Sequence, residues 1–218
     1  MKFNHIELGK EVPSLKQLNE DGTRYYVTPE GNKYPSVTTI LSSHNKKAIM
    51  EWRNRVGHEK AQKITTQASV RGTRFHKLCE DYLNNEDIEF KTPLEQEVFN
   101  EFKPILHNID NIYAQELRMY SDHLRAAGTV DCVGEYQGHL AIIDFKTSSK
   151  PKKEEWIENY FMQCAAYAVM FEERFDIPVN NLVVLISVND NKPQIFVKKR
   201  DEYIEKFLEY RDLNEEKA

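Results

Sequence analysis

Two aspartates and a lysine near the middle of the chain stand where a β-hairpin would bring them together. The stretch 128–147 reads GTVDCVGEYQGHLAIIDFKT, and its Gly138 tolerates the positive φ that a tight turn needs. A turn centred just before Gly138 makes paired residue numbers sum to 275, so Asp131 faces Asp144. Because side chains alternate faces along a strand, Lys146 points the same way as Asp144. Two carboxylates and an ammonium group are therefore expected on one side of the hairpin.

Directly opposed side chains have Cβ atoms roughly 5 Å apart, and like charges at that distance destabilise a strand pair. One compensation is a structural salt bridge with Lys146, although the strand around Asp144 is very apolar and desolvating three ionisable groups is a poor source of stability. A second is a general acid and base formed by the two carboxylates. A third is a hard divalent cation held by both aspartates, because Mg²⁺ is commonly held by one or two carboxylates. The third account uses all three residues.

A histidine and a glutamine add candidate polar groups at helical spacing. His76 and Glu80 are four residues apart and share one face of a predicted helix, while Phe75 can face the core. Gln163 precedes Tyr167 by the same spacing, in the helix expected after the hairpin. A lone histidine on a helix is usually structural, and a buried glutamine can satisfy its own hydrogen bonds. These residues gain interest only beside the hairpin cluster.

Three apolar stripes predict helices ahead of the hairpin. The first follows Asn45, contains Ile49, Trp52 and Val56, and is expected to turn Trp52 toward the core; the second covers residues 75–82. The third begins at Thr92-Pro93-Leu94-Glu95, which combines a capping box with proline at the first helical position. Pro104 is expected to kink or break this third helix.

The remaining chain predicts a sheet. The expected elements are strands at 112–120, 128–136 and 139–146, a helix at about 154–173, strands at 182–188 and 194–197, and a last helix from Asp201. Helices followed by an antiparallel meander, a crossover helix and a further strand describe an α/β fold with a mixed central β-sheet flanked by helices.

The composition indicates a folded, soluble protein. With 218 residues, 40% of them hydrophobic and 11% aromatic, the chain can build one domain with a sizeable core. The longest near-continuous apolar run, 182–188, is far shorter than the roughly 20 residues of a membrane span. The first residues lack the apolar stretch of a secretory signal, and early acidic residues argue against a transit peptide. The widely spaced cysteines, Cys79, Cys132 and Cys164, disfavour disulfides and an iron–sulfur cluster, so a reducing compartment is expected.

The net charge hides a local reversal of sign. The whole chain has 30 basic and 35 acidic residues, a balance of −5 that argues against a nucleic-acid partner. The segment 46–77, however, contains nine basic and two acidic residues, so it carries +7 and leaves −12 for the remainder. Attraction is screened beyond roughly 8 to 10 Å at ordinary salt, so a local basic segment is what contact with a polyanion needs.

In order and spacing, these elements resemble the RecB-like branch of the PD-(D/E)XK nuclease superfamily, most of all the mitochondrial genome maintenance exonucleases and their phage and bacterial relatives. The similarity covers about residues 35–188. It is carried by Pro35-Ser-Val-Thr38, Arg71-Gly-Thr-Arg-Phe-His76, Glu116, Asp131-Cys-Val-Gly-Glu-Tyr-Gln-Gly138, Ile143-Asp-Phe-Lys-Thr147 and Gln163-x-x-x-Tyr167. The resemblance implies a restriction-endonuclease-like core preceded by an N-terminal helical region.

The resemblance also implies a role for each matching residue. His76, Asp131 and Asp144 would coordinate a catalytic Mg²⁺ or Mn²⁺, with the backbone carbonyl of Phe145 as a further ligand. Lys146 would orient or help deprotonate the attacking water and stabilise charge in the transition state. Glu116 matches an additional acid of the family, and Gln163 matches the polar residue of its bridging helix.

The residues expected at the DNA are Ser36, Thr38, Arg71, Arg74, Lys77 and Tyr167. For Ser36 and Thr38 a turn-and-cap role is nearly as good an explanation, and Tyr167 also suits packing. The whole chain, 1–218, is expected to form one nuclease domain, with a mainly helical, basic, DNA-binding part at 1–110, the catalytic sheet at 111–200 and an acidic C-terminal helix at 201–218.

The implied activity is a metal-dependent DNA exonuclease that prefers single-stranded ends and leaves 5′-phosphates. A structure-specific or restriction-type endonuclease is the alternative within enzymes, and a non-catalytic DNA-binding factor in recombination or replication is the alternative of another class. We expect a monomer that binds no membrane. The absence of a signal or transit peptide predicts the cytoplasm of a bacterium or of a phage-infected cell.

Overall fold

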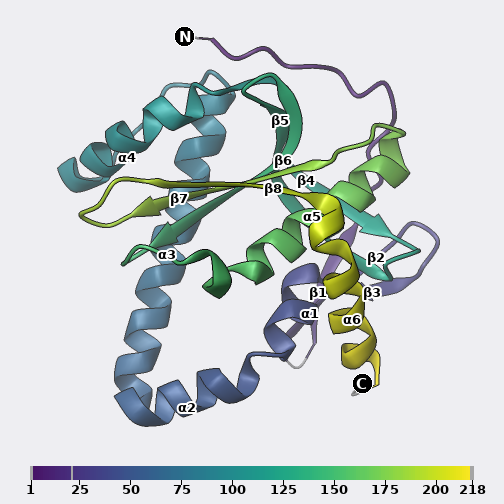
Figure 1. Ribbon diagram of the computed structural model, residues 1–218, viewed down its shortest axis with the longest axis horizontal. Helices are drawn as coiled ribbons and strands as arrows, with labels where there is room; N and C mark the ends of the chain where they lie inside the picture. Colours follow the sequence, from purple (N-terminus) through teal and green to yellow (C-terminus); the bar gives the residue numbers. More distant parts are fainter. Residues whose placement is uncertain (1, 21, 217–218) are drawn as a thin grey trace.

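A five-stranded mixed sheet forms the centre of the computed structural model, which describes residues 2–20 and 22–216 (Figure 1). Its strands, in spatial order, are β4 (Ile109–Ser121), β5 (Ala126–Tyr136), β6 (His139–Ser148), β7 (Asn181–Val188) and β8 (Gln194–Lys199). β4, β5 and β6 form an antiparallel meander, β7 runs parallel to β6, and β8 is antiparallel to β7. A parallel pair needs a crossover, and helix α5 (Glu158–Phe175) supplies it. The predicted mixed α/β fold is confirmed.

The β5–β6 hairpin has the register that the sequence predicts. Tyr136 pairs with His139, and the ladder continues to Cys132 and Ile143, where it ends. The turn residues Gln137 and Gly138 both have positive φ, 51° and 79°, which suits the twist of a two-residue hairpin. Beyond Cys132 and Ile143 the strands separate, and β6 continues its pairing with β7 alone. Asp131 and Asp144 therefore lie just where the hairpin opens.

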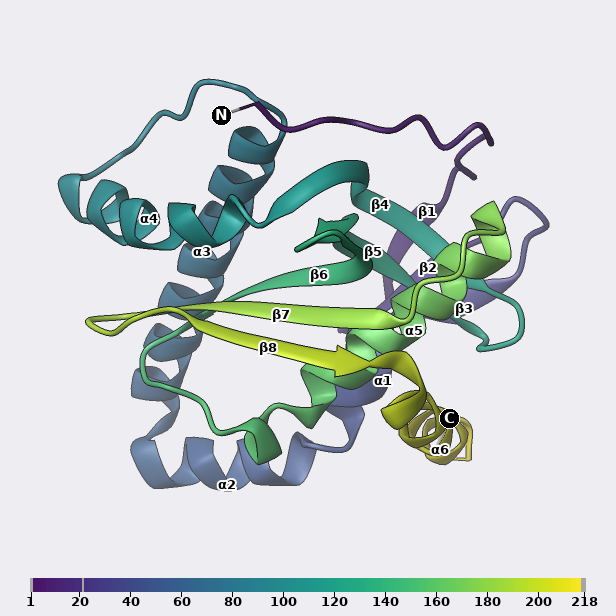
Figure 2. The same cartoon turned by 45° about the horizontal axis from the view of Figure 1, so that its top comes forward.

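Two apolar cores hold the sheet between helices (Figure 2). On one face, α5 packs with α1 (Val37–Ser43) and α6 (Ile204–Glu215). On the other face lie α3 (His58–Leu83) and α4 (Pro93–Leu106). Ile142 belongs to the α5 side, whereas Ile143 and Phe145 belong to the α3 side, so the predicted alternation along β6 is confirmed. Short 3₁₀ turns at Glu154–Trp156 and Arg200–Glu202 precede α5 and α6.

Helix α4 begins where the sequence predicts and continues two residues past Pro104, where a kink or break was expected. The Thr92 hydroxyl accepts a hydrogen bond from the Glu95 backbone N–H at 3.1 Å, and Pro93 is the first helical residue. The helix runs through Pro104 and ends at Leu106, so this proline lies within the last turn. Pro104 lacks the N–H that would donate to the Asn100 carbonyl, but only two helical residues follow it, so its effect is confined to the last turn.

Helix α2 (Lys46–Val56) forms as predicted but contributes no fully buried residue. Ile49 is 43% exposed and Met50 64%, and Trp52 is only half-buried, so the expectation that Trp52 belongs to the core is wrong. The physical reason is the placement of the helix. α2 and the first half of α3 extend away from the sheet, so the apolar stripe of α2 meets no sheet face (Figures 1 and 2).

A second, three-stranded antiparallel sheet precedes the helices. It consists of β1 (Lys16–Glu20), β2 (Thr23–Val27) and β3 (Lys33–Pro35), and the description of residues 1–110 as mainly helical misses it. Strands of three to five residues are too short for a convincing alternation of polar and apolar residues. The small sheet instead gains its place from tertiary contacts.

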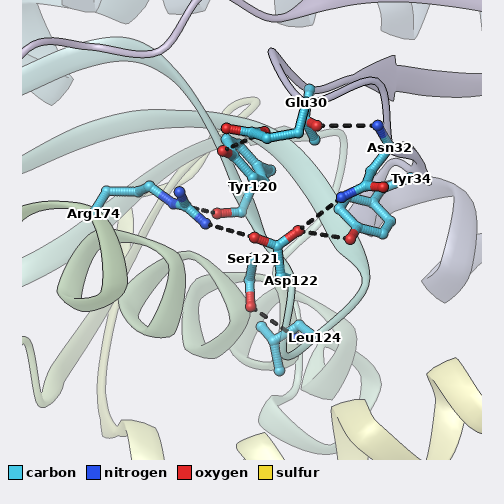
Figure 3. Close-up of polar contacts among 9 residues, drawn as sticks. Glu30, Asn32, Tyr34, Tyr120, Ser121, Asp122, Leu124 and Arg174 are labelled. Atoms are coloured by element: carbon cyan, nitrogen blue, oxygen red, sulfur yellow. Dashed lines mark hydrogen bonds and ion pairs between the residues drawn. The ribbon is translucent and has the colours of Figure 1, made fainter.

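A polar cluster attaches this small sheet to the main one (Figure 3). The Tyr34 hydroxyl donates to Asp122 at 2.7 Å, and the Tyr120 hydroxyl donates to Glu30 at 3.0 Å. Arg174 of α5 donates to Asp122 at 3.3 Å and stacks over the Tyr120 ring at 3.7 Å. Asp122 thus connects three elements, and the small sheet is held as a rigid wall beside β4 and β5. No helix in the described part of the chain has the length and apolar character needed to cross a membrane.

Candidate active site

A cleft of about 700 Å³ lies where the β5–β6 hairpin opens. Helices α1, α3 and α5, strands β4 to β6 and the small sheet all contribute side chains to its wall. Among the predicted site residues, those that line it are Ser36, Thr38, His76, Glu116, Asp131, Lys146, Gln163 and Tyr167. Segments more than 100 residues apart in the sequence therefore meet at one place.

His76, Glu116 and Asp131 form a cluster of potential metal ligands. One ligand atom from each lies within 4.8 Å of the others. His76 Nδ1 is 3.5 Å from Asp131 Oδ1, and the Phe145 backbone N–H donates to Asp131 Oδ2 at 2.8 Å. The bond to Phe145 fixes Asp131 at the point where β5 leaves β6. One carboxylate oxygen of Asp131 is thereby left to face the histidine.

Glu116 reaches this cluster through an unusual backbone conformation. Its neighbours Gln115 and Leu117 pair with Cys132 and Val130, so Glu116 lies across from Asp131. Its φ is +47°, a value that costs free energy for a residue with a side chain. Surrounding protein atoms raise the pKa of Glu116 to about 7, and the Asp131 charge adds to the shift, although part of the side chain meets solvent. A nearby positive charge would relieve this repulsion.

Asp144 and Lys146 form a buried ion pair beside the cluster. Lys146 Nζ lies 2.6 Å from Asp144 Oδ1 and 2.5 Å from Oδ2, and Asp144 is 1% exposed. Gln163 Nε2 donates to Asp144 Oδ1 at 3.1 Å from α5. Burial raises the pKa of Asp144 to about 6 against the opposing effect of Lys146. Burial alone would lower the pKa of Lys146, but the Asp144 and Asp131 charges outweigh it and raise that pKa.

The donor set fits a hard divalent cation. Two carboxylates and an imidazole are ligands that Mg²⁺ or Mn²⁺ accepts. They lie close together although the carboxylates of Glu116 and Asp131 repel each other. Within the described residues, Asp144 lies outside this cluster of three because its oxygens face Lys146 and Gln163. The structure therefore groups Glu116, rather than Asp144, with His76 and Asp131.

The residues predicted at the DNA separate into different surroundings. Ser36 is 2% exposed, and its hydroxyl caps α1 by accepting from the Thr39 N–H at 3.0 Å, which gives Ser36 a structural role. The Thr38 hydroxyl accepts from Arg24 at 2.9 Å at the cleft. Tyr167 is 3% exposed and packs on Gly128, where an added Cβ would lie 2.7 Å from the ring. Packing is thus the observed role of Tyr167.

The basic residues of α3 differ from one another as well. Arg74 donates to both oxygens of Glu95, at 2.8 and 3.1 Å, so its guanidinium is committed to α4. Lys77 is half-exposed and pairs with Glu80 and Asp81 at 3.3 and 2.7 Å. Arg71 donates to the Thr147 hydroxyl of β6 at 3.4 Å. Of these three residues, Arg71 is the one without a carboxylate partner among the described residues.

Several cleft residues were missed by the sequence reading, among them Gln17, Arg24 and Arg118. Gln17 and Arg24 come from the small sheet, whose strands had no convincing pattern. Arg118 also lines the cleft and stands two residues after Glu116 on β4. The i, i+2 spacing from Glu116 is the signal that could have found Arg118, because such residues share a face of a strand.

The sequence pattern of the PD-(D/E)XK nuclease superfamily matches residues 91–217, more than half of the chain. The chain belongs to this superfamily. The match spans α4, the whole central sheet and α5, which are the elements that place Glu116, Asp131, Asp144, Lys146 and Gln163.

Curated relatives extend the similarity toward the N-terminus. The mitochondrial genome maintenance exonuclease 1 of Homo sapiens is 28% identical over 178 residues, which is 74% of this chain and 51% of that protein. Its Mus musculus counterpart is 29% identical over 179 residues, covering 74% and 52%. This chain spans about half the length of the curated relatives that it matches. A proposed exonuclease of Eubacterium rectale, known from a crystal structure, aligns over 69% of this chain and 65% of its own, with 14% identity and a TM-score of 0.49.

Proposed function

We propose that this chain is a divalent-metal-dependent deoxyribonuclease that degrades single-stranded DNA from an end and leaves 5′-phosphates. The observation that carries the proposal is the meeting of His76, Glu116 and Asp131 with the Asp144–Lys146 pair at one cleft of a PD-(D/E)XK nuclease core. Relatives that are named exonucleases favour attack at ends over internal cleavage. Location in the cytoplasm, a monomeric state and the absence of an iron–sulfur cluster stay predictions.

The cluster supplies the positions for Mg²⁺ or Mn²⁺. His76, Glu116 and Asp131 would hold the ion, with Asp144 and the Phe145 carbonyl as the further ligands expected from the family. Such an ion, when bound, polarises the scissile phosphate and lowers the pKa of a water molecule. The hydrogen bond from the Phe145 N–H keeps Asp131 oriented toward the cluster.

Lys146 acts in this proposal as a fixed positive charge. Its pKa is raised by the two aspartates, so it keeps its proton at neutral pH and is a poor base. Its ammonium lines the cleft and lies 5.1 Å from the centre of the Tyr160 ring. A cation held in this way stabilises the negative charge that develops on the phosphate. Asp144 and Gln163 position Lys146 rather than react themselves.

The test is digestion of single-stranded and duplex DNA, each labelled at either end, with Mg²⁺, with Mn²⁺ and with a chelator. Circular single-stranded DNA of the same sequence is the matched control. We expect the linear single strand to be degraded in a metal-dependent way, the circle to stay intact, and the products to carry phosphatase-sensitive 5′-phosphates.

Each arm can contradict a separate part of the proposal. Cleavage of the circle would indicate an endonuclease. Binding of DNA with no cleavage under any metal would favour the non-catalytic alternative. Full activity in the presence of the chelator would overturn the metal site.

A further inference from the structure

The arginines of this chain divide into two groups by their partners. Arg74, Arg125, Arg174, Arg200 and Arg211 each form an ion pair with a carboxylate of the protein. Among the described residues, Arg24, Arg53, Arg55, Arg71 and Arg118 lie within 4 Å of no carboxylate oxygen. Three of the second group belong to the basic segment 46–77, whereas Arg24 and Arg118 lie far from it in sequence.

Arg24 and Arg118 both line the cleft that contains the metal-ligand cluster. Arg24 comes from β2 of the small sheet, and Arg118 comes from β4 of the main sheet. Both are exposed, and each is steadied by one hydrogen bond. Arg24 donates to the Thr38 hydroxyl at 2.9 Å, and Arg118 donates to the Leu15 carbonyl at 3.4 Å. Since a guanidinium has five N–H donors, most of their donors stay available to a ligand in the cleft.

The strand geometry sets the distance between Arg118 and the cluster. Arg118 of β4 pairs with Thr129 of β5. Glu116 lies two residues before Arg118 and Asp131 lies two residues after Thr129, so both acidic residues are displaced from the Arg118–Thr129 pair in the same direction. Two residues of a strand span about 7 Å, which is close to the length of one nucleotide of extended backbone. The small sheet is held against β4 by the Asp122 contacts, so Arg24 has a fixed place on the same side.

We propose that Arg24 and Arg118 together bind the phosphate next to the scissile one, on the side of the small sheet. This inference rests on the proposed function and adds a substrate subsite to it. Planar guanidinium groups suit a phosphate because each can donate two parallel hydrogen bonds. Arg71 hydrogen-bonds to Thr147 of β6 and lies outside the wall of this cleft, so it provides positive charge elsewhere along that strand.

The experiment uses single-stranded oligonucleotides that each carry one uncharged methylphosphonate at a different position from the end. Binding is measured with Ca²⁺, and cleavage with Mg²⁺, for the wild type and for the double variant Arg24→Ala/Arg118→Ala. In the wild type, we expect one position next to the scissile phosphate to weaken binding about tenfold, about the effect of losing one charged contact. In the double variant, the same substitution should change binding less than twofold.

The salt dependence gives a second readout. Because the two arginines neutralise one phosphate of the single strand, the slope of log affinity against log salt should decrease by about 0.7 in the double variant. Arg125→Ala is the matched control, because Arg125 pairs with Glu215 of α6 and does not line the cleft. This control should keep the wild-type slope and the wild-type response to the methylphosphonates.

The outcomes separate this inference from the proposed function. If the wild type cleaves DNA but the double variant keeps both the slope and the methylphosphonate response, the phosphate subsite is wrong and the nuclease proposal stands. If the wild type cleaves nothing, the nuclease proposal fails, and the binding measurements still decide whether the arginines contact a phosphate. A folded double variant, checked by circular dichroism, is required for either conclusion.

Discussion

Helices α5 and α2 both contribute to the cleft, yet they are built in opposite ways. Most of α5 is buried, and it presents Gln163 and Tyr167 from a packed core. α2 has no fully buried residue, reaches the cleft through Ile49, and carries Arg53, which is half-buried, and Arg55, which is exposed. Under the proposed function, the comparison suggests a division of work, in which α5 supplies a polar group from a packed core and α2 supplies positive charge from outside it. Substitutions in the two regions should therefore differ in kind.

The largest effect is expected at the buried pair. Lys146→Ala removes the positive charge that lies beside the metal-ligand cluster, so cleavage of single-stranded DNA should fall about 10²- to 10³-fold, as for the loss of other electrostatic stabilisers. Affinity for DNA in Ca²⁺ should change only a few-fold. Single-turnover rates and fluorescence anisotropy measure the two quantities.

The same substitution leaves Asp144 buried without its partner, and a carboxylate in that position destabilises the fold. Lys146→Met keeps the volume of the side chain and serves as the companion variant. Unchanged cleavage in both folded variants would disprove the assigned role of Lys146.

An intermediate effect is expected where β5 meets α5. Gly128→Ala would place a methyl group 2.7 Å from the buried Tyr167 ring. Overpacking of this kind costs about 1 to 3 kcal/mol, so the urea midpoint should fall while the slope of the unfolding curve stays constant. Gly138→Ala is not a suitable control because of its positive φ, whereas Gly72→Ala meets only one atom, at 4.0 Å.

Two results would sharpen or break this part of the comparison. A double variant Gly128→Ala/Tyr167→Phe that stays as unstable as Gly128→Ala would show that the ring, not the hydroxyl, is the obstacle. Full stability of Gly128→Ala would mean that α5 yields, and that the packed region is less rigid than described.

The smallest effect is expected on α2. Arg53→Ala/Arg55→Ala removes two charges that form no ion pair within the described residues, Arg55 exposed and Arg53 half-buried, so the salt slope of DNA binding should decrease by up to about 1.4. Unfolding free energy should stay within about 0.5 kcal/mol per substitution, as is usual for surface positions. Single-turnover cleavage at saturating enzyme should not change. A lower single-turnover rate would show that α2 acts in catalysis, and the proposed difference in role between α2 and α5 would then be wrong.

Much of the fold was accessible to sequence reading because its signals are local. The Thr92 cap, the two-residue turn at Gly138 and the alternation along β6 depend on neighbours only, so the hairpin register was predicted correctly. Sequence reading failed where the burial of a side chain depends on which distant elements pack against it. Trp52 belongs to an apolar stripe with ordinary helical spacing, but no element in the described part of the chain buries that stripe fully.

The sequence alone determined which groups exist and which pairs are close along a strand or helix. It placed Asp131 and Asp144 at facing positions of a hairpin and Lys146 on the same face, because strand and turn geometry are short-range. Only the tertiary structure decided what each group contacts. It turned Glu116 toward His76 and Asp131 through a positive φ, paired Arg74 with Glu95, and placed Arg24 of an unpredicted sheet in the wall of the cleft that Arg118 also lines. Those choices depend on contacts between distant segments, which no local pattern encodes.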